Sequence, residues 1–230
     1  MIGATEKGTG LPMPDGPSKV LTIGHSTLSF ETFLSMLKAA GVTAVADVRS
    51  SPVSRRVPHF NREELEAALN DHGVEYRFLG KELGGRPRAS DLYCDGVADY
   101  EKMAREPAFR TGLKRVIKGA KEHTIALMCS EHNPLDCHRC LLVGRALAER
   151  NVSVGHILSN GRIIEQRDIE EKLLALFDTP MNDFFDSREV TSSEGRLAAA
   201  YRQRSLAVAY REPQRDTDRF AHKHWRDHAR

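Results

Sequence analysis

The sequence predicts an α/β protein: a doubly wound, mostly parallel sheet with helices on both faces, plus a C-terminal appendage that is helical or disordered. Short apolar runs alternate along the chain with segments whose apolar residues recur at helical spacing. Strands that alternate with helices form a parallel sheet covered on both faces, and right-handed crossovers make that sheet doubly wound. In such folds, ligands bind beyond the carboxyl ends of the strands.

The first part of the chain contains three predicted strands and two predicted helices. The strands are short and apolar, and they cover Val20–Gly24, Val42–Val48 and Val74–Leu79. The helix over Leu28–Ala40 has one apolar face and ends at Gly41. The helix over Arg62–Asp71 has Asn61 as its N-terminal cap and Gly73 as its stop signal.

The second part of the chain continues the same alternation. A long helical region, about Val97–Glu122, precedes the apolar strand Thr124–Met128. The elements expected after it are a helix over Cys137–Arg150, a strand over Val152–Leu158, a turn at Asn160-Gly161, a short segment over Arg162–Glu165 and an amphipathic helix over Asp168–Phe177.

Both ends of the chain differ in composition from this central domain. Residues 1–19 form a Gly- and Pro-containing leader that we expect to be flexible, and residues 20–178 form the α/β domain. Residues 179–230 form a charged extension, partly helical or disordered, in which Ser193–Arg211 could be a helix. Its Arg- and His-rich end, Arg215–Arg230, could touch nucleic acid, although its mixed charges favour a solvated tail.

Composition excludes several classes of protein. The net charge of +2 does not imply strong non-specific attraction to nucleic acid or membranes. No apolar run approaches the roughly 18 residues needed to cross a bilayer, and the N-terminus lacks an apolar signal core. Four cysteines in a chain of 230 residues do not form a disulfide framework. We therefore expect a cytoplasmic protein with no membrane partner; the composition does not define the oligomeric state.

The stretch from Met128 to Cys140 concentrates most of the reactive side chains. It connects a strand to a helix, whose N-terminus would offer free N–H groups and partial positive charge. Glu131 could act as a general acid or base, and its alternative role is capping the loop or helix. His138 and Arg139 could bind phosphate, or form a salt bridge to Asp47 or Asp136.

The cysteines of this stretch allow several interpretations. Cys129, at the end of its strand, is a candidate nucleophile, but Pro134 removes a backbone donor and a packed thiol is the alternative. Cys137 and Cys140 form a C-x-x-C pair at a helix start, which is where redox dithiols occur. The thiols with His132 or His138 could also bind zinc. The spacing lacks two paired knuckles, so we assign no metal ligands and leave a divalent metal as a possible cofactor.

Other polar residues are expected on the same rim of the sheet. Asp47 and Arg49 lie two apart and share a face; Asp47 could act as a base and Arg49 could hold an anion, or the two could form a structural ion pair. His25 follows the first strand and could orient a substrate or serve as a structural hydrogen-bonding group. The loop over Gly80–Arg86, called the glycine loop below, contributes the remaining candidates for anion binding, Gly84, Gly85 and Arg86.

Together these residues resemble the family known as domain of unknown function 488. The matching motifs are Thr22-Ile23-Gly24-His25-Ser26, Asp47-Val48-Arg49 with Pro52, Leu79-Gly80 with Leu83-Gly84-Gly85, and C-x-E-x-x-P-x-x-C-H-R on Cys129, Glu131, Pro134, Cys137, His138 and Arg139. The resemblance covers about residues 20–175. It implies a small bacterial or archaeal α/β domain with a polar site on the rim, and it supplies no reaction. Cys140 lies outside the family pattern.

Three functional hypotheses follow. The leading one is an enzyme that acts on a nucleotide or nucleic acid by hydrolysis or group transfer. In it Glu131 or Asp47 transfers protons, Arg49 and Arg139 hold phosphate, and His25 and His138 orient the substrate. The second is a sulfur-transfer or thiol-redox enzyme that uses Cys129, Cys137 or Cys140. The third is a non-catalytic nucleic-acid-binding module that uses the arginines of the rim and the tail.

Overall fold

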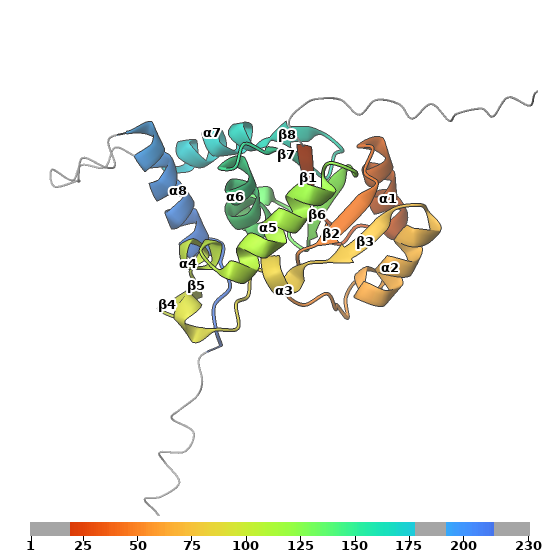
Figure 1. Ribbon diagram of the computed structural model, residues 1–230, viewed down its shortest axis with the longest axis horizontal. Coiled ribbons are helices and arrows are strands. Elements are labelled where there is room, and N and C mark those ends of the chain that lie inside the picture. Colours follow the sequence, from red (N-terminus) through yellow and green to blue (C-terminus); the bar gives the residue numbers. More distant parts are fainter. Residues whose placement is uncertain (1–18, 178–191, 214–230) are drawn as a thin grey trace, which may run out of the picture.

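A computed structural model describes residues 19–177 and 192–213 of the chain (Figure 1). Most of the expected leader and the Arg- and His-rich end lie outside the described residues. A six-stranded sheet in the order β3-β2-β6-β1-β7-β8 forms the centre of the protein. The fold class predicted from the alternating pattern is therefore confirmed.

All neighbouring strands of this sheet run parallel except the last pair, β7 and β8, which is antiparallel. The strands of the sheet are β1 (Lys19–Gly24), β2 (Ala44–Asp47), β3 (Glu75–Phe78), β6 (Ile125–Cys129), β7 (Ser153–Ile157) and β8 (Ile163–Glu165). Gly24 and Asp47 pair with Cys129 and Met128, respectively. The carboxyl ends of β1, β2 and β6 therefore lie at the same edge of the sheet.

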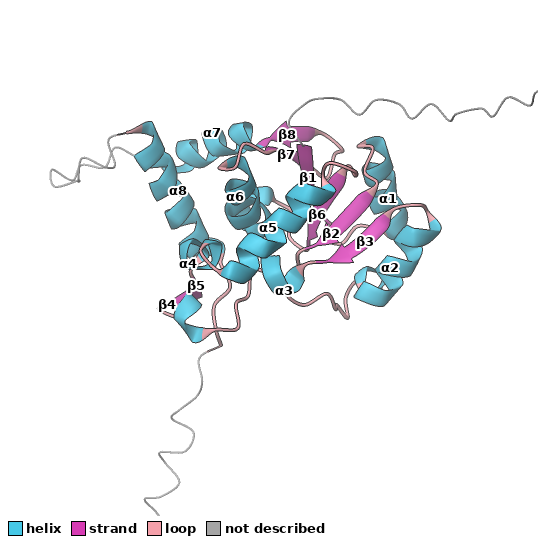
Figure 2. Ribbon diagram, in the orientation of Figure 1, coloured by secondary structure: helices cyan, strands magenta, loops and turns pink. Residues whose placement is uncertain are grey.

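Helices cover both faces of the sheet (Figure 2). On one face lie α1 (Phe30–Ala39) and α2 (Arg62–Asp71), and on the other α5 (Pro107–Gly119), α6 (Arg145–Ala148) and α7 (Gln166–Phe177). Side chains of a strand point to alternate faces, so Leu127 packs in the core under α5 whereas Met128 packs in the core under α1. This burial on both faces explains why the inner strand β6 is a continuous apolar run.

The long helical region expected at about Val97–Glu122 begins with a strand and is divided into two helices. The structure has a small hairpin of β4 (Tyr93–Cys94) and β5 (Val97–Ala98), then α4 (Tyr100–Ala104) and a separate α5. Gly96 has φ of 73° in the hairpin turn, a conformation that favours glycine. The side chain of Asp99 caps α4 by accepting from the backbone of Glu101 and Lys102, and Pro107 begins α5. Asp-Gly and Pro are punctuation signals that divide this region into three elements.

Shorter helical turns complete the fold. They are α3 (Gly80–Leu83) and the 3₁₀ turns Pro58–Phe60, Ser90–Leu92 and Pro134–Asp136. The helix expected over Cys137–Arg150 begins as a π-helical segment, Arg139–Gly144, and continues as α6. Such π-helical segments inside helices are rare and often occur at functional sites.

The helix α8 (Ser193–Val208) lies within the expected C-terminal appendage and packs on the α/β domain. Tyr201 is 1% exposed, and its hydroxyl donates to Glu170 and accepts from Gln166. After α8 the chain pairs with the hairpin, because the backbone of Ala98 donates to Tyr210. None of the helices in the described ranges is long and apolar enough to span a membrane.

Candidate functional site

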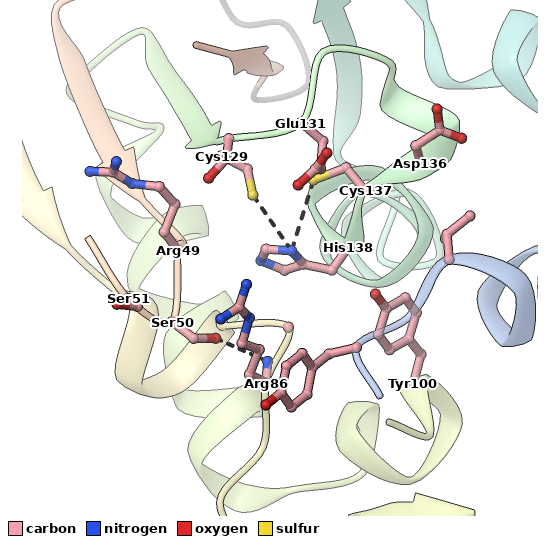
Figure 3. Close-up of a pocket in the computed structure, with 14 residues that line it drawn as sticks. Arg49, Ser50, Ser51, Arg86, Tyr100, Cys129, Glu131, Asp136, Cys137 and His138 are labelled. Carbon is pink, nitrogen blue, oxygen red and sulfur yellow. Dashed lines mark hydrogen bonds between the residues drawn. The ribbon is translucent and has the colours of Figure 1, made fainter. Parts of the chain in front are cut away.

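A polar cavity of about 320 Å³ opens at the carboxyl ends of β2 and β6 (Figure 3). Cys129, Glu131, Cys137 and His138 come from the loop that follows β6, and Ser50 and Ser51 from the loop after β2. Gly85 and Arg86 form one wall, and Tyr100, Val208 and Tyr210 form another. The cavity therefore lies on the rim where the sequence predicted the site.

Two thiols and one imidazole meet at the base of this cavity. Nδ1 of His138 lies 3.7 Å from Sγ of Cys129 and 3.8 Å from Sγ of Cys137. Nε2 of His138 lies 2.9 Å from the carbonyl oxygen of Val48, and since a carbonyl only accepts, Nε2 carries a hydrogen. That bond orients Nδ1 toward both sulfurs. We call Cys129, Cys137 and His138 the thiol–imidazole cluster.

The two thiols have opposite acid–base behaviour. A hydrogen bond to Cys137, followed by burial, raises the pKa of Cys129. Burial also acts to raise the pKa of Cys137, but the hydrogen bond from Cys129 and the positive charges of Arg139 and His138 outweigh it, so this pKa is lowered. Cys137 is therefore the more acidic thiol of the pair.

Arg139 places a positive charge next to the thiol–imidazole cluster. Its side chain is fully buried, and its guanidinium donates to the carbonyl oxygens of Glu131 and His132. Its Nε has no partner among the described residues, and its backbone N–H lies 3.5 Å from Sγ of Cys137. Arg139 thus fixes the loop after β6 and stabilises negative charge on sulfur, and it does not form the salt bridge to Asp47 or Asp136 considered from the sequence.

Glu131 and Arg86 are the charged side chains on the exposed side of the cavity. Partial burial and the negative charge of Cys137 raise the pKa of Glu131, and Figure 3 shows its carboxylate beside Cys137. The Arg86 guanidinium lies 4.8 Å from the centre of the Tyr210 ring, a cation–π geometry. A carboxylate, a thiol–imidazole cluster and a guanidinium therefore face one space.

Asp47, Arg49 and His25 form a buried hydrogen-bonded network next to the cavity. The carboxylate of Asp47 accepts from Arg49 and from the hydroxyl of Tyr76, which lies 2.7 Å away. Arg49 also donates to Nε2 of His25 at 3.1 Å, and His25 stacks on Phe60. Burial, followed by the charge of Arg49, lowers the pKa of His25 to about 4. The polar groups of this network bind one another, as in the structural ion pair considered from the sequence.

The glycine loop approaches the cluster closely. A Cβ on Gly85 would lie 2.7 Å from Cγ of His138, and one on Gly84 would lie 2.4 Å from Oγ of Ser50. The hydroxyl of Ser50 accepts from the backbone N–H of Arg86 at 2.9 Å. Glycine is thus required for the loop to place Arg86 over the cavity while His138 keeps its orientation.

The structure brings together only part of the set predicted from the sequence. Glu131, Cys129, Cys137, His138, Gly85 and Arg86 line the cavity, and Arg49 reaches its edge. Asp47, His25, Gly84 and Arg139 lie behind it. The sulfur of Cys140 turns away from Cys137 and contacts Gln166 at 3.9 Å. The thiol that faces Cys137 is that of Cys129. The C-x-x-C pair of Cys137 and Cys140 expected from the sequence is therefore wrong.

Several residues that line the cavity were not predicted from the sequence. Tyr100, Val208 and Tyr210 reach the cavity by long-range packing, which no local pattern indicates. A second polar network was also missed, in which buried His156 bridges Thr22 and Gln166 at 2.8 and 2.7 Å. His156 lies within the apolar strand β7 and looks like an ordinary core position in the sequence.

Comparison with known proteins identifies one family. The model of the family described as Domain of unknown function DUF488 matches residues 29–146, slightly more than half of the chain. No curated protein and no solved structure matches the chain. The matched residues include the thiol–imidazole cluster, Glu131 and the glycine loop, whereas Val208 and Tyr210 lie beyond them.

Proposed function

The chain belongs to the DUF488 family, whose description names no activity, and we propose from the cavity that it is an enzyme acting on a nucleotide or nucleic acid by hydrolysis or group transfer. One observation carries this proposal. The Glu131 carboxylate stands beside the thiol–imidazole cluster in a polar cavity that also holds the guanidinium of Arg86. Proton transfer and anion binding can therefore occur in the same space.

Glu131 is the residue placed to transfer protons. It is the cavity carboxylate next to the cluster, and its side chain has no hydrogen-bonded partner among the contacts described above. Asp136, the other carboxylate that lines the cavity, is bound by Arg204 of α8. Asp47, the alternative considered from the sequence, is held by Arg49 and Tyr76. Glu131 therefore keeps the proposed catalytic role, and Asp47 positions Arg49.

The substrate class follows from the walls of the cavity. Arg86 offers a guanidinium that suits phosphate, and Ser50 and Ser51 add hydroxyl groups. Tyr100 and Tyr210 present aromatic rings, on which bases stack. Arg49 and Arg139, the phosphate ligands expected from the sequence, have guanidinium groups bound to Asp47 and to backbone carbonyls. Arg86 takes over this role in the proposal.

A second candidate function is thiol chemistry, favoured by the contact between Cys129 and Cys137. A lowered pKa makes Cys137 the nucleophile of the pair, and Cys129 would be the second thiol of a sulfur-transfer or dithiol reaction. Alkylation with iodoacetamide separates the two candidates. In the thiol mechanism, Cys137→Ser abolishes activity and substrate protects the thiol from alkylation.

Turnover of nucleotides, nucleosides and short DNA and RNA, followed by product analysis, tests the leading proposal. Glu131→Gln keeps the size of the side chain, and we expect it to lower kcat by about 100-fold or more, the usual contribution of a general acid or base. Glu122→Gln, an exposed carboxylate at the other end of β6, is the matched control. Full activity of Glu131→Gln would contradict the role of Glu131. Binding with a steep salt dependence but no product would favour the non-catalytic nucleic-acid-binding module.

A further inference from the structure

The thiol–imidazole cluster has the composition and geometry of a metal site. Its three donor atoms lie within 4.8 Å of one another, and no other group of three or more such side chains in residues 19–177 and 192–213 is as close. Thiolate and imidazole are the ligands that zinc prefers. We propose that Cys129, Cys137 and His138 bind a Zn²⁺ ion whose fourth coordination position opens into the cavity beside Glu131.

The distances agree with a tetrahedral ion. Zinc–sulfur bonds of about 2.3 Å and zinc–nitrogen bonds of about 2.0 Å place sulfur and nitrogen about 3.5 Å apart in a tetrahedron. The two sulfur–nitrogen distances of the cluster are 3.7 and 3.8 Å. The two sulfur–nitrogen distances therefore need to shorten by only a few tenths of an ångström for the ion to bind.

The hydrogen bonds around the cluster resemble those that orient the ligands of a metal ion. A metal-bound histidine almost always donates its other ring N–H to a carbonyl or carboxylate, and His138 donates Nε2–H to Val48. Backbone N–H groups reach both sulfurs, from Glu131 to Cys129 and from Arg139 to Cys137. Such bonds orient the sulfurs before the ion arrives, and when it binds, the protons that remain on the sulfurs and on Nδ1 of His138 leave as H⁺.

Three protein ligands and an open position are typical of catalytic zinc, whereas structural zinc has four. The open position faces the cavity, where the carboxylate of Glu131 lies closest to Cys137 (Figure 3). A water molecule bound there would give one proton to Glu131, and the resulting hydroxide would attack the phosphorus or carbon atom of the substrate. The bond to the leaving group then breaks, and the leaving group takes the proton from Glu131. This reaction rests on the proposed function, but zinc binding does not.

The test uses the full chain, purified under reducing conditions and without substrate. We expect about one Zn²⁺ per chain by elemental analysis. The X-ray absorption spectrum of the zinc should show two sulfur neighbours at about 2.3 Å and lighter neighbours at about 2.0 Å. A coordination shell made only of oxygen and nitrogen would overturn the proposal, and this measurement needs no variant.

Variants then assign the ligands. Cobalt bound to thiolates gives intense sulfur-to-metal absorption, so Co²⁺ titration reports on the sulfurs directly. Cys137→Ser should weaken Co²⁺ binding by more than about 100-fold, because even the outer partners of ligands contribute 10- to 100-fold. The matched control is Cys140→Ser, which changes another fully buried thiol, one that contacts Gln166. Circular dichroism establishes that each variant folds.

The outcomes separate this inference from the proposed function. Unchanged metal content and absorption in folded Cys137→Ser would overturn the zinc site, and so would a Cys129–Cys137 disulfide that forms in preference to metal binding. Zinc binding with no turnover of any nucleotide would leave the site in place and refute the substrate class. Turnover that depends on Glu131 in a metal-free protein would support the enzyme and refute the zinc.

Discussion

Acid should destabilise this protein through a buried histidine that does not line the cavity. His156 is fully buried, its Nε2–H donates to Gln166, and its Nδ1 accepts from the hydroxyl of Thr22. Gln166 in turn donates to Tyr201 on α8. These hydrogen bonds are complete with a neutral imidazole, whereas protonation would place a positive charge on a fully buried group.

The magnitude follows from the pKa. Burial, opposed in part by the bond to Gln166, lowers the pKa of His156 from 6.5 to about 4. One pKa unit corresponds to about 1.4 kcal/mol, so neutral His156 contributes about 3 kcal/mol of stability. The unfolded state binds the proton first, and therefore this contribution is complete above pH 6.5 and is lost as the pH falls to about 4. The pKa of His25 is lowered in the same way, so two imidazoles act in this window.

Urea denaturation at intervals between pH 7 and pH 4 measures the effect. His156→Gln should lose stability at pH 7, and the difference from the original protein should shrink by about 3 kcal/mol toward pH 4. Thr22→Val is the control, because it removes one hydrogen bond and keeps the imidazole; we expect a loss of about 1 kcal/mol that varies far less with pH. Parallel stability curves for His156→Gln and the original protein would refute the reasoning.

Two further substitutions test the buried contacts next to the cavity, the Asp47–Arg49 ion pair and the close approach of Gly85 to His138. Asp47→Asn leaves the buried guanidinium of Arg49 without its carboxylate, and we expect a loss of about 3–5 kcal/mol in urea denaturation; a loss under 1 kcal/mol would show that the pair is dispensable. Gly85→Ala places a methyl group against His138, so it should weaken Co²⁺ binding and lower stability by about 1–3 kcal/mol. Its control is Gly41→Ala, which strains a residue with φ of 67° but has open space around it. It should lower stability and leave the cobalt spectrum unchanged.

The fold was largely predictable from the sequence because the four inner strands, β2, β6, β1 and β7, are buried on both faces over most of their length. Burial on both faces requires apolar runs such as Ile125–Cys129, which no surface strand would tolerate. The region after Tyr93 was mispredicted because residues at helical spacing continue through it. Asp95-Gly96, Asp99 and Pro107 carried the information that divides it.

The candidate site was only partly predictable, because sequence spacing does not give the direction of a side chain. Cys137 and Cys140 are neighbours in the chain, yet the π-helical segment after His138 turns Cys140 toward Gln166. Cys129 reaches Cys137 because the 3₁₀ turn at Pro134–Asp136 returns the chain to the end of β6. The placement of Tyr210 depends on pairing with Ala98, a contact between distant parts of the chain.

The pairing between Tyr210 and the hairpin separates two properties of the cavity. Its reactive groups come from the loop after β6, whereas one wall comes from Val208 and Tyr210, which lie beyond the residues matched by the family. Substitutions at these two positions can reshape the entrance without moving a sulfur or the imidazole. Relatives could therefore share one chemistry and diverge in the molecules they admit, with the change confined to a few residues near the end of the chain.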